Sequence, residues 1–394
     1  MSLVSRNLSH YGRASYSANR LLDASQRQSS QPTTVSSRRY LFSEEVLGVD
    51  RFLDVRTKIN SQFGKHKEKF YDRFEEHLKG EKSSILSEDL KNLIFLCDKA
   101  PKEVDLLKQA IAIFEKQNES LRFGNFQFGP IVMRMAYHLN LPEFAMMLME
   151  KEYINFFSQL SSVTIALDLL FKNERYEDVV KVFNFVTENY KFDTKYPSDF
   201  VTLYLASCYK INTLEAFDQS YRLLRSVKAS TNVVKSRGMG SFLALAVNQK
   251  QPNIALEIIQ TLSVKSYSTI IQSIRVQAFA EIERFHDAFD ILRYQLKKDK
   301  AVTRYKAVHQ ETLNKIEKLI SESSKKDLLP EFQLLVKNLS ESNLVETEKT
   351  LEQAILLPIE VVSPKSGQRK QSQQQQKQIQ PIQRTKQSAK VAAN

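Results

Sequence analysis

The residue types that most often carry catalysis or bind metal ions are few in this sequence, and they are not clustered. The two cysteines, Cys97 and Cys208, lie in apolar stretches, where a thiol behaves as a small hydrophobic group. The six histidines show no metal-ligand spacing with each other or with the cysteines. Only nine glycines are present, and neither GxGxxG nor GxxxxGK(S/T) occurs. We therefore expect no enzyme activity, no bound metal ion and no cofactor.

Basic side chains are the other candidates for chemistry, but most of the net charge of +12 lies at the two ends of the chain. Residues 1–42 contribute +5 and residues 363–394 contribute +7. Residues 43–362 are formally neutral, with 44 basic and 44 acidic side chains. An affinity of the central part for RNA would therefore have to come from local clusters of basic residues rather than from its total charge.

A short sequence motif recurs through the central part and predicts which helices would position such clusters of basic residues. In each copy a small residue is followed four positions later by a larger one, and an apolar run precedes both. The small residues are Ala110, Ala145, Val179, Ala216, Ala255 and Ala288, spaced by 35, 34, 37, 39 and 33 residues. A small residue near the start of a second helix lets the first helix approach closely, and the larger residue fills the groove beside it. The spacing predicts about six two-helix units over residues 87–298.

The polar residues between the two helices of each unit fit the ends of helices. Asparagine and glutamine lie where one helix must end and the next must begin, and proline follows in two units, where a missing N–H costs little. These residues are Asn140, Asn173, Asn212 and Gln251, with Pro142 and Pro252 after them. One such hairpin cannot bury its own apolar sides, so neighbouring units must stack. The predicted fold class is all-α, a right-handed α-solenoid with helical caps.

The sequence pattern of the repeats resembles that of the pentatricopeptide repeat family more than that of the tetratricopeptide family. Tetratricopeptide repeats usually contain a Trp-Leu-Gly…Tyr pattern in the first helix, and this chain has no tryptophan. The stretches FQFGPIVMRMAYHLNL at 126–141, LSSVTIALDLLFKNERYEDVVKVF at 160–183 and LYLASCYKIN at 203–212 are similar to mitochondrial pentatricopeptide repeat proteins. The resemblance, over about residues 38–295, implies a mitochondrial RNA-associated factor that supports transcript maturation and thereby the respiratory chain.

The resemblance also implies where RNA would be contacted. In such repeats each first helix offers side chains to one unstacked base. The corresponding positions, fifteen residues before each small residue, are Phe95, Pro130, Thr164, Val201, Gly240 and Ser273. Of these, only Thr164 and Ser273 can form good hydrogen bonds with a base edge, which argues against sequence-specific reading. Basic residues on or beside the first helices could contact phosphates instead, namely Lys91, Arg134, Lys172, Lys210, Lys235, Arg237 and Arg275.

The first 40 residues have the composition of a mitochondrial transit peptide. They are rich in arginine and serine, contain one acidic residue, and carry arginines every seven positions from Arg6 to Arg27. Arg38 lies three residues before Leu41, and the aromatic Tyr40 lies directly before it, as in a matrix-protease site. We predict cleavage between Tyr40 and Leu41 and a location in the mitochondrial matrix. An ordinary disordered N-terminus is the alternative.

The remaining segments flank the array. Residues 44–86 and 299–357 are charged and amphipathic, and we expect them to form the N-terminal and C-terminal helical caps that an open solenoid needs. Residues 363–394 contain a run of four glutamines and scattered basic residues, and we expect them to be disordered. No apolar run approaches the ~18 residues of a membrane-spanning helix.

Together these features predict a protein that binds single-stranded mitochondrial RNA, acts with other RNA-processing proteins, and does not cut RNA itself. The alternative, from another class, is a tetratricopeptide-like scaffold that binds proteins. The two would differ in whether the neutral central part has affinity for RNA.

Overall fold

The computed structural model describes residues 41–80, 84–117, 126–230, 232–262, 268–297 and 306–359. The predicted transit peptide 1–40 and the predicted basic tail 363–394 lie outside these ranges. In the described ranges the regular secondary structure is helical apart from two short contacts between extended segments. One pairs β1 (Val308–His309) with β2 (Val345–Glu346) in parallel, and the other is a single bridge between Phe42 and Ile359. The all-helical repeat solenoid expected from the sequence is confirmed.

The array consists of helical hairpins, each made of a first and a second helix. The pairs are α4 (Ser87–Leu96) with α5 (Pro101–Lys116), α6 (Gly129–Leu139) with α7 (Pro142–Leu148), α9 (Leu160–Lys172) with α10 (Tyr176–Asn189), α11 (Ser198–Ile211) with α12 (Leu214–Ala229), α13 (Ser236–Asn248) with α14 (Pro252–Thr261), and α15 (Thr269–Glu281) with α16 (Phe285–Lys297). All six predicted small residues lie on second helices and are buried. A further hairpin, α17 (Gln310–Glu322) with α18 (Leu329–Glu341), stacks on α15 and α16 within the segment expected to be the C-terminal cap.

Elements before, within and after the array complete the described part. Before the array lie α1 (Glu44–Leu47), α2 (Val49–Phe63) and α3 (Lys67–Leu78), and α8 (Ile154–Phe157) lies between the second and third hairpins. After the array, α19 (Leu351–Ile355) follows β2. Turns of 3-10 helix occur at Gly64–His66, Lys151–Tyr153 and Lys326–Leu328.

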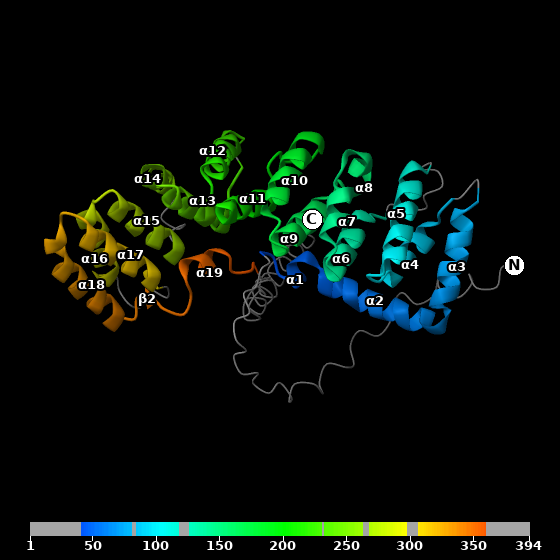
Figure 1. The fold of residues 1–394 in the computed structure, drawn as a ribbon, viewed down its shortest axis with the longest axis horizontal. Helices are drawn as coiled ribbons and strands as arrows, with labels where there is room; N and C mark the ends of the chain where they lie inside the picture. Colours follow the sequence, from blue (N-terminus) through cyan, green and yellow to red (C-terminus); the bar gives the residue numbers. More distant parts are fainter. Residues whose placement is uncertain are drawn as a thin grey trace, which may run out of the picture. The chain divides into compact units, whose positions relative to one another are not determined.

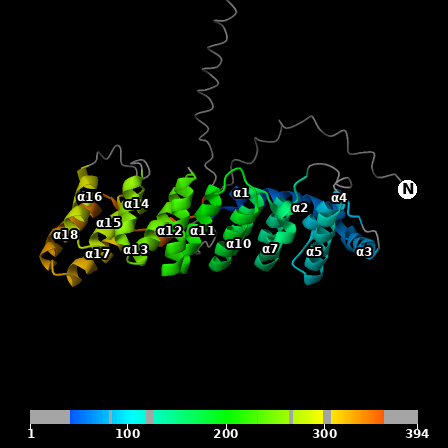
Figure 2. The same ribbon diagram turned by 90° about the horizontal axis from the view of Figure 1, so that it is seen from above.

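Successive first helices lie side by side, and they form one face of the array. α6 contacts α9, α9 contacts α11, and the series continues through α13 and α15 to α17. Figure 1 shows this order of hairpins along the chain, and the turned view in Figure 2 shows the second helices from α5 to α16 following the same order. We call the surface of α4, α6, α9, α11, α13 and α15 that turns away from the second helices the first-helix face.

The turns within the hairpins are linked by side chains of neighbouring units. Asn140 and Asn212 end α6 and α11 in the left-handed conformation, each with a φ of 53°. The Asn140 and Asn173 amides bond to each other, at 3.1 and 2.8 Å, and Gln249 Nε2 donates to Asn212 Oδ1 at 2.9 Å. Asparagine tolerates a positive φ better than other residues with a side chain. The helix-ending role predicted for these asparagines is confirmed.

We expect Asn212→Ala to lower the free energy of unfolding by about 1–2 kcal/mol, because alanine is strained in the left-handed conformation. Asn212→Gly should cost less than half as much, since glycine adopts that conformation without strain although it also loses the contact with Gln249. Urea unfolding of both variants measures the difference. Equal losses would contradict the backbone explanation.

Candidate nucleic-acid interface

The first-helix face is covered by segments from both ends of the described chain. Near one end, α2 contacts α4 and α6, and α1 contacts α9. Near the other end, α19 contacts α13 and α15. Figure 1 shows α1 and α2, in dark blue, along the array beside α6 and α9, and α19, in orange, beside the later hairpins. The segments expected to cap the two ends of the array therefore also lie along it.

The positions predicted to face RNA bases contact the protein's own chain. The Phe95 ring on α4 stacks on the Phe52 ring of α2, with 5.1 Å between centroids. Ser273 is fully buried, and its hydroxyl accepts from the His309 N–H at 3.0 Å. A Cβ on Gly240 would lie 4.0 Å from Ile355 of α19.

The other three base-facing positions are no more available. Pro130 and Val201 are buried. Thr164 is partly exposed, but its hydroxyl donates to the Leu160 carbonyl at 2.9 Å. Among these six positions, only the Thr164 hydroxyl is left to a base, and only as an acceptor.

Three of the predicted phosphate-binding cations bond to the covering segments. Arg134 Nε donates to the Leu47 carbonyl at the end of α1, at 2.9 Å. Arg237 donates to the Ala354 carbonyl at the end of α19, at 2.5 Å, and burial lowers the pKa of its guanidinium. Lys210 pairs with Glu352 of α19 at 2.8 Å.

The remaining predicted cations have partners within the array. Lys235 pairs with Asp199. Lys91 pairs with Glu88 at 2.6 Å. The Lys172 ammonium lies 4.5 Å from the centre of the Tyr137 ring, and Arg275 lies 6.0 Å from that of Phe279. The predicted residues do lie on or beside the first helices, but each has a neighbour in the folded chain, and their role in RNA binding stays a prediction.

The predicted cleavage site falls at the edge of the described part. Arg38 and Tyr40 lie outside it, whereas Leu41 is described and buried. Leu41 and Phe42 both donate their backbone N–H to Oδ1 of Asp168 on α9, at 3.0 and 3.1 Å. The Ile359 N–H donates to the Leu41 carbonyl at 2.8 Å. The first described residues are thus fixed to α9 and to the last described residue.

Asp168 is the most deeply buried carboxylate at this face. Its exposed fraction is zero, and Tyr137 donates its hydroxyl to Oδ2 at 3.0 Å. Burial raises the pKa of this carboxyl to about 7, although the bonds from Tyr137, Leu41 and Phe42 and the charge of Lys172 oppose the increase. The sequence contains a signal for this site, because Asp168 interrupts the apolar run of α9.

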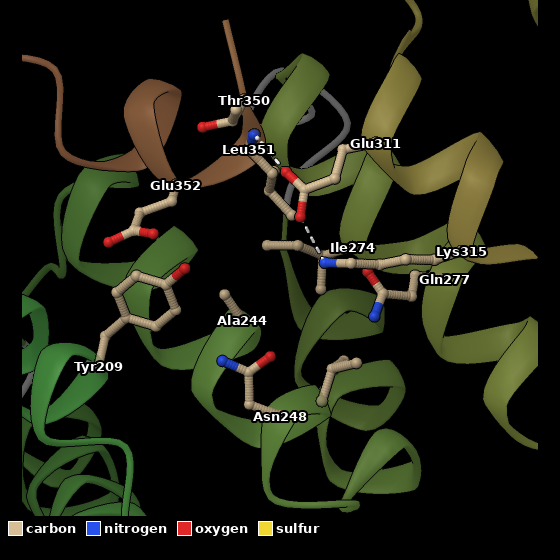
Figure 3. Close-up of a pocket in the computed structure, with 11 residues that line it drawn as sticks. Tyr209, Ala244, Asn248, Ile274, Gln277, Glu311, Lys315, Thr350, Leu351 and Glu352 are labelled. Carbon is tan, nitrogen blue, oxygen red and sulfur yellow. Dashed lines mark hydrogen bonds and ion pairs between the residues drawn. The ribbon is translucent and has the colours of Figure 1, made fainter.

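A cavity of about 360 Å³ remains between α19 and the first helices α11, α13 and α15, closed on one side by α17. Figure 3 shows Tyr209, Asn248 and Gln277 around it, with residues 350–352 along its upper side. The Glu311 carboxylate pairs with Lys315 at 2.6 Å and accepts from the Leu351 N–H at 3.2 Å. Burial favours the neutral form of Glu311, but these two partners outweigh it and lower its pKa.

One group of exposed cations was not anticipated from the sequence. Arg222, Arg225 and Lys228 lie on α12, a second helix, and the ion pairs found in the described part involve none of them. Their spacing of three places them along one side of the helix, which is the signal that could have identified them. We call these three residues the α12 stripe.

Two kinds of site do not occur in the described ranges. No group of three or more His, Cys, Asp or Glu side chains is arranged to hold a metal ion there. In the same ranges, no helix is long and apolar enough to cross a bilayer.

The fold places the chain in the class of two-helix repeat solenoids, and the comparison with known proteins narrows this class. No family model matches the chain. It is similar to pentatricopeptide repeat-containing protein 2, mitochondrial, from mouse (Mus musculus), with 29% identity over 57% of this chain and 58% of that protein. The proteins of the same name from Pongo abelii (30% identity, 57% of each chain) and zebrafish (Danio rerio; 28% identity, 65% of this chain and 66% of that protein) are also similar.

The predicted resemblance to mitochondrial pentatricopeptide repeat proteins is confirmed. Each match covers less than two thirds of the relative's length.

We expect Arg237→Ala to speed hydrogen exchange of the amides in residues 351–359 by about tenfold or more, because hydrogen bonds to a charged donor contribute about 1.5–3 kcal/mol. Lys210→Ala is the matched control, since it removes a partly exposed ion pair to the same helix and should have a small effect. Mass spectrometry of exchanged peptides measures both. Equal effects would contradict the role of Arg237 in holding α19.

We also expect Asp168→Asn to change how stability depends on pH in the chain that still carries residues 1–40. In the unfolded chain the Asp168 carboxyl has the ordinary aspartate pKa of about 3.9. The folded chain therefore holds the Asp168 proton more tightly than the unfolded chain does. The contribution of Asp168 is therefore greatest below about pH 4 and is lost as the pH rises to about 7. The melting temperature of the parent should fall relative to that of Asp168→Asn over this interval. A constant difference would contradict the raised pKa.

Proposed function

We propose that this protein is an RNA-associated factor of the mitochondrial matrix that supports transcript maturation, and thereby the respiratory chain, without cutting RNA itself. It binds single-stranded RNA through backbone phosphates and acts with other RNA-processing proteins. Two observations support the class of function: the array of two-helix repeats, and the similarity to mitochondrial pentatricopeptide repeat proteins.

The covered first-helix face supports binding to phosphates rather than reading of bases. Phe95 stacks on Phe52, and Ser273 is buried against His309, so neither can contact a base unless the covering segments move. Base discrimination needs side chains at base edges, whereas phosphate contacts need only accessible positive charge. This occupation of the base-facing positions by the chain itself is the observation that carries the proposal.

The α12 stripe is the best candidate for phosphate contact in the described part. Arg222, Arg225 and Lys228 are exposed, and their charges are not compensated by a nearby carboxylate in an ion pair. Phosphates of one strand can follow such a row of cations along a helix surface. The cations of the first helices, by contrast, would have to give up bonds such as that from Arg237 to Ala354.

A protein-binding scaffold is the second candidate function, and one observation favours it. The first-helix face already holds a short helix, α19, through the Arg237 bond to its carbonyl end and the Lys210 pair with Glu352. A face that binds a segment of its own chain in this way has the chemistry to bind a helical peptide of another protein.

We expect reversal of the three charges of the α12 stripe, R222E/R225E/K228E, to weaken binding of single-stranded RNA. It should also reduce the slope of log affinity against log salt by about 2, because each phosphate contact on a single strand contributes about 0.7 to that slope. Fluorescence anisotropy with a labelled RNA at several salt concentrations measures both quantities on the chain from Leu41 to Asn394.

The matched control is K326E/K337E/K349E, which reverses three exposed charges outside the array. It changes the net charge equally and should leave the slope nearly unchanged. An equal loss in both variants would mean that only net charge attracts RNA. If the parent chain binds no RNA at physiological salt, the scaffold function replaces the RNA function.

A further inference from the structure

The carboxylate of Asp168 is buried with three donors, and none of them carries a charge in the uncleaved chain. Leu41 and Phe42 offer backbone N–H groups to Oδ1, and Tyr137 offers its hydroxyl to Oδ2. Lys172, whose charge acts on Asp168, lies on the Tyr137 ring, and no ion pair with Asp168 is found in the described part. A buried carboxylate without a cationic partner is costly, so this site favours the arrival of a positive charge.

The predicted transit-peptide cleavage would create a positive charge at one of these donors. Hydrolysis of the Tyr40–Leu41 bond adds water, leaving a carboxylate on Tyr40 and an amino group on Leu41. An α-amino group ordinarily has a pKa of about 7.7–8.0, so it is largely protonated at neutral pH. The nitrogen that becomes this ammonium is the Leu41 nitrogen that already lies 3.0 Å from Asp168 Oδ1.

We propose that Asp168 is the binding site for the α-ammonium group of Leu41, so that removal of the transit peptide creates a buried ion pair at the first-helix face. The proposal rests on the predicted cleavage between Tyr40 and Leu41 and goes beyond RNA binding. No movement of the backbone is needed, because the amide that is cleaved and the ammonium that forms share the same nitrogen. A bond between two charged groups replaces one in which only the carboxylate carries a charge.

The ion pair anchors more than the first residue. The Leu41 carbonyl accepts from Ile359, and the Ser43 N–H donates to the Ile359 carbonyl at 3.1 Å. Ser43 then begins α1, because its hydroxyl accepts from the Val46 N–H. Fixing Leu41 on α9 therefore fixes both the start of α1 and the segment after α19. Maturation would tighten the cover of the first-helix face at the point where its two ends meet.

The direct test compares four chains that differ only in their first residue and at position 168. Two begin at Leu41, with Asp168 or with Asp168→Asn, and two begin at Tyr40 with the same pair. In the Tyr40 chains the free amine lies one residue farther along and the Leu41 nitrogen is again an amide. The rate at which an amine-reactive ester labels the N-terminus is measured from pH 6 to 10, with the product located by mass spectrometry.

We expect the midpoint of the pH profile to lie at least one unit higher in the Leu41 chain with Asp168 than in the other three. Labelling near pH 7 should then be about tenfold slower, because one unit means a tenfold smaller fraction of free amine. Poor access alone would lower the rate at every pH without moving the midpoint. A midpoint at the ordinary value in the Leu41 chain would overturn the proposal, whether or not Asp168→Asn folds.

A second measurement tests whether the protein is cleaved between Tyr40 and Leu41 in mitochondria. The N-terminus of the protein isolated from mitochondria is sequenced, and it should begin at Leu41. A mature protein that begins at another residue would overturn the proposal that cleavage forms this ion pair. Neither measurement depends on RNA binding, so a failure of the proposed function would not change either result.

Discussion

Nine consecutive residues of α11, from Phe200 to Cys208, are buried, and the other central first helices are similar. In α13 the buried run extends from Gly240 to Val247, and in α9 from Ile165 to Phe171. A helix that is buried all round must have neighbours on every side. The second helices of its own and of the preceding hairpin and the adjacent first helices pack around it, as α12, α10, α9 and α13 do around α11, and a further segment must cover what remains. In this protein the chain's own ends provide that cover, and most of the features at the first-helix face follow from this constraint.

The constraint separates this protein from a solenoid whose first helices are open to RNA. The basic groups that could bond to a phosphate lie on or beside the first helices, but Arg134, Lys210 and Arg237 bond to the covering segments. The other four have partners within the array. Arg134 and Arg237 satisfy the carbonyl ends of α1 and α19, where a positive charge is favoured by the helix dipole. The cavity beside α19 at this face is lined by Asn248 and Gln277 and by the Glu311–Lys315 pair. RNA binding would then depend on charges outside this face or on release of its cover.

Much of the fold could be predicted because its signals are local. The small residues from Ala110 to Ala288 recur at the spacing of one hairpin, and asparagine at a helix end needs only its neighbours to act. The cover could not be predicted in the same way, because its contacts are distant in sequence: Arg134 reaches Leu47 across 87 residues, and Arg237 reaches Ala354 across 117. Two signals were nevertheless present. Unbroken apolar runs in the first helices indicate burial on all sides, and a carboxylate within such a run, Asp168, indicates a specific partner.

Hydrogen exchange of the mature chain with and without single-stranded RNA tests the central claim most directly, because it reports on the cover and on the RNA site together. If the first-helix face is covered and RNA binds outside it, residues 351–359 and α2 exchange slowly in the free protein. RNA then slows exchange around α12 and leaves the covering segments unchanged. Fast exchange of residues 351–359 in the free protein would contradict this account. So would RNA that releases these residues and protects α11 and α13.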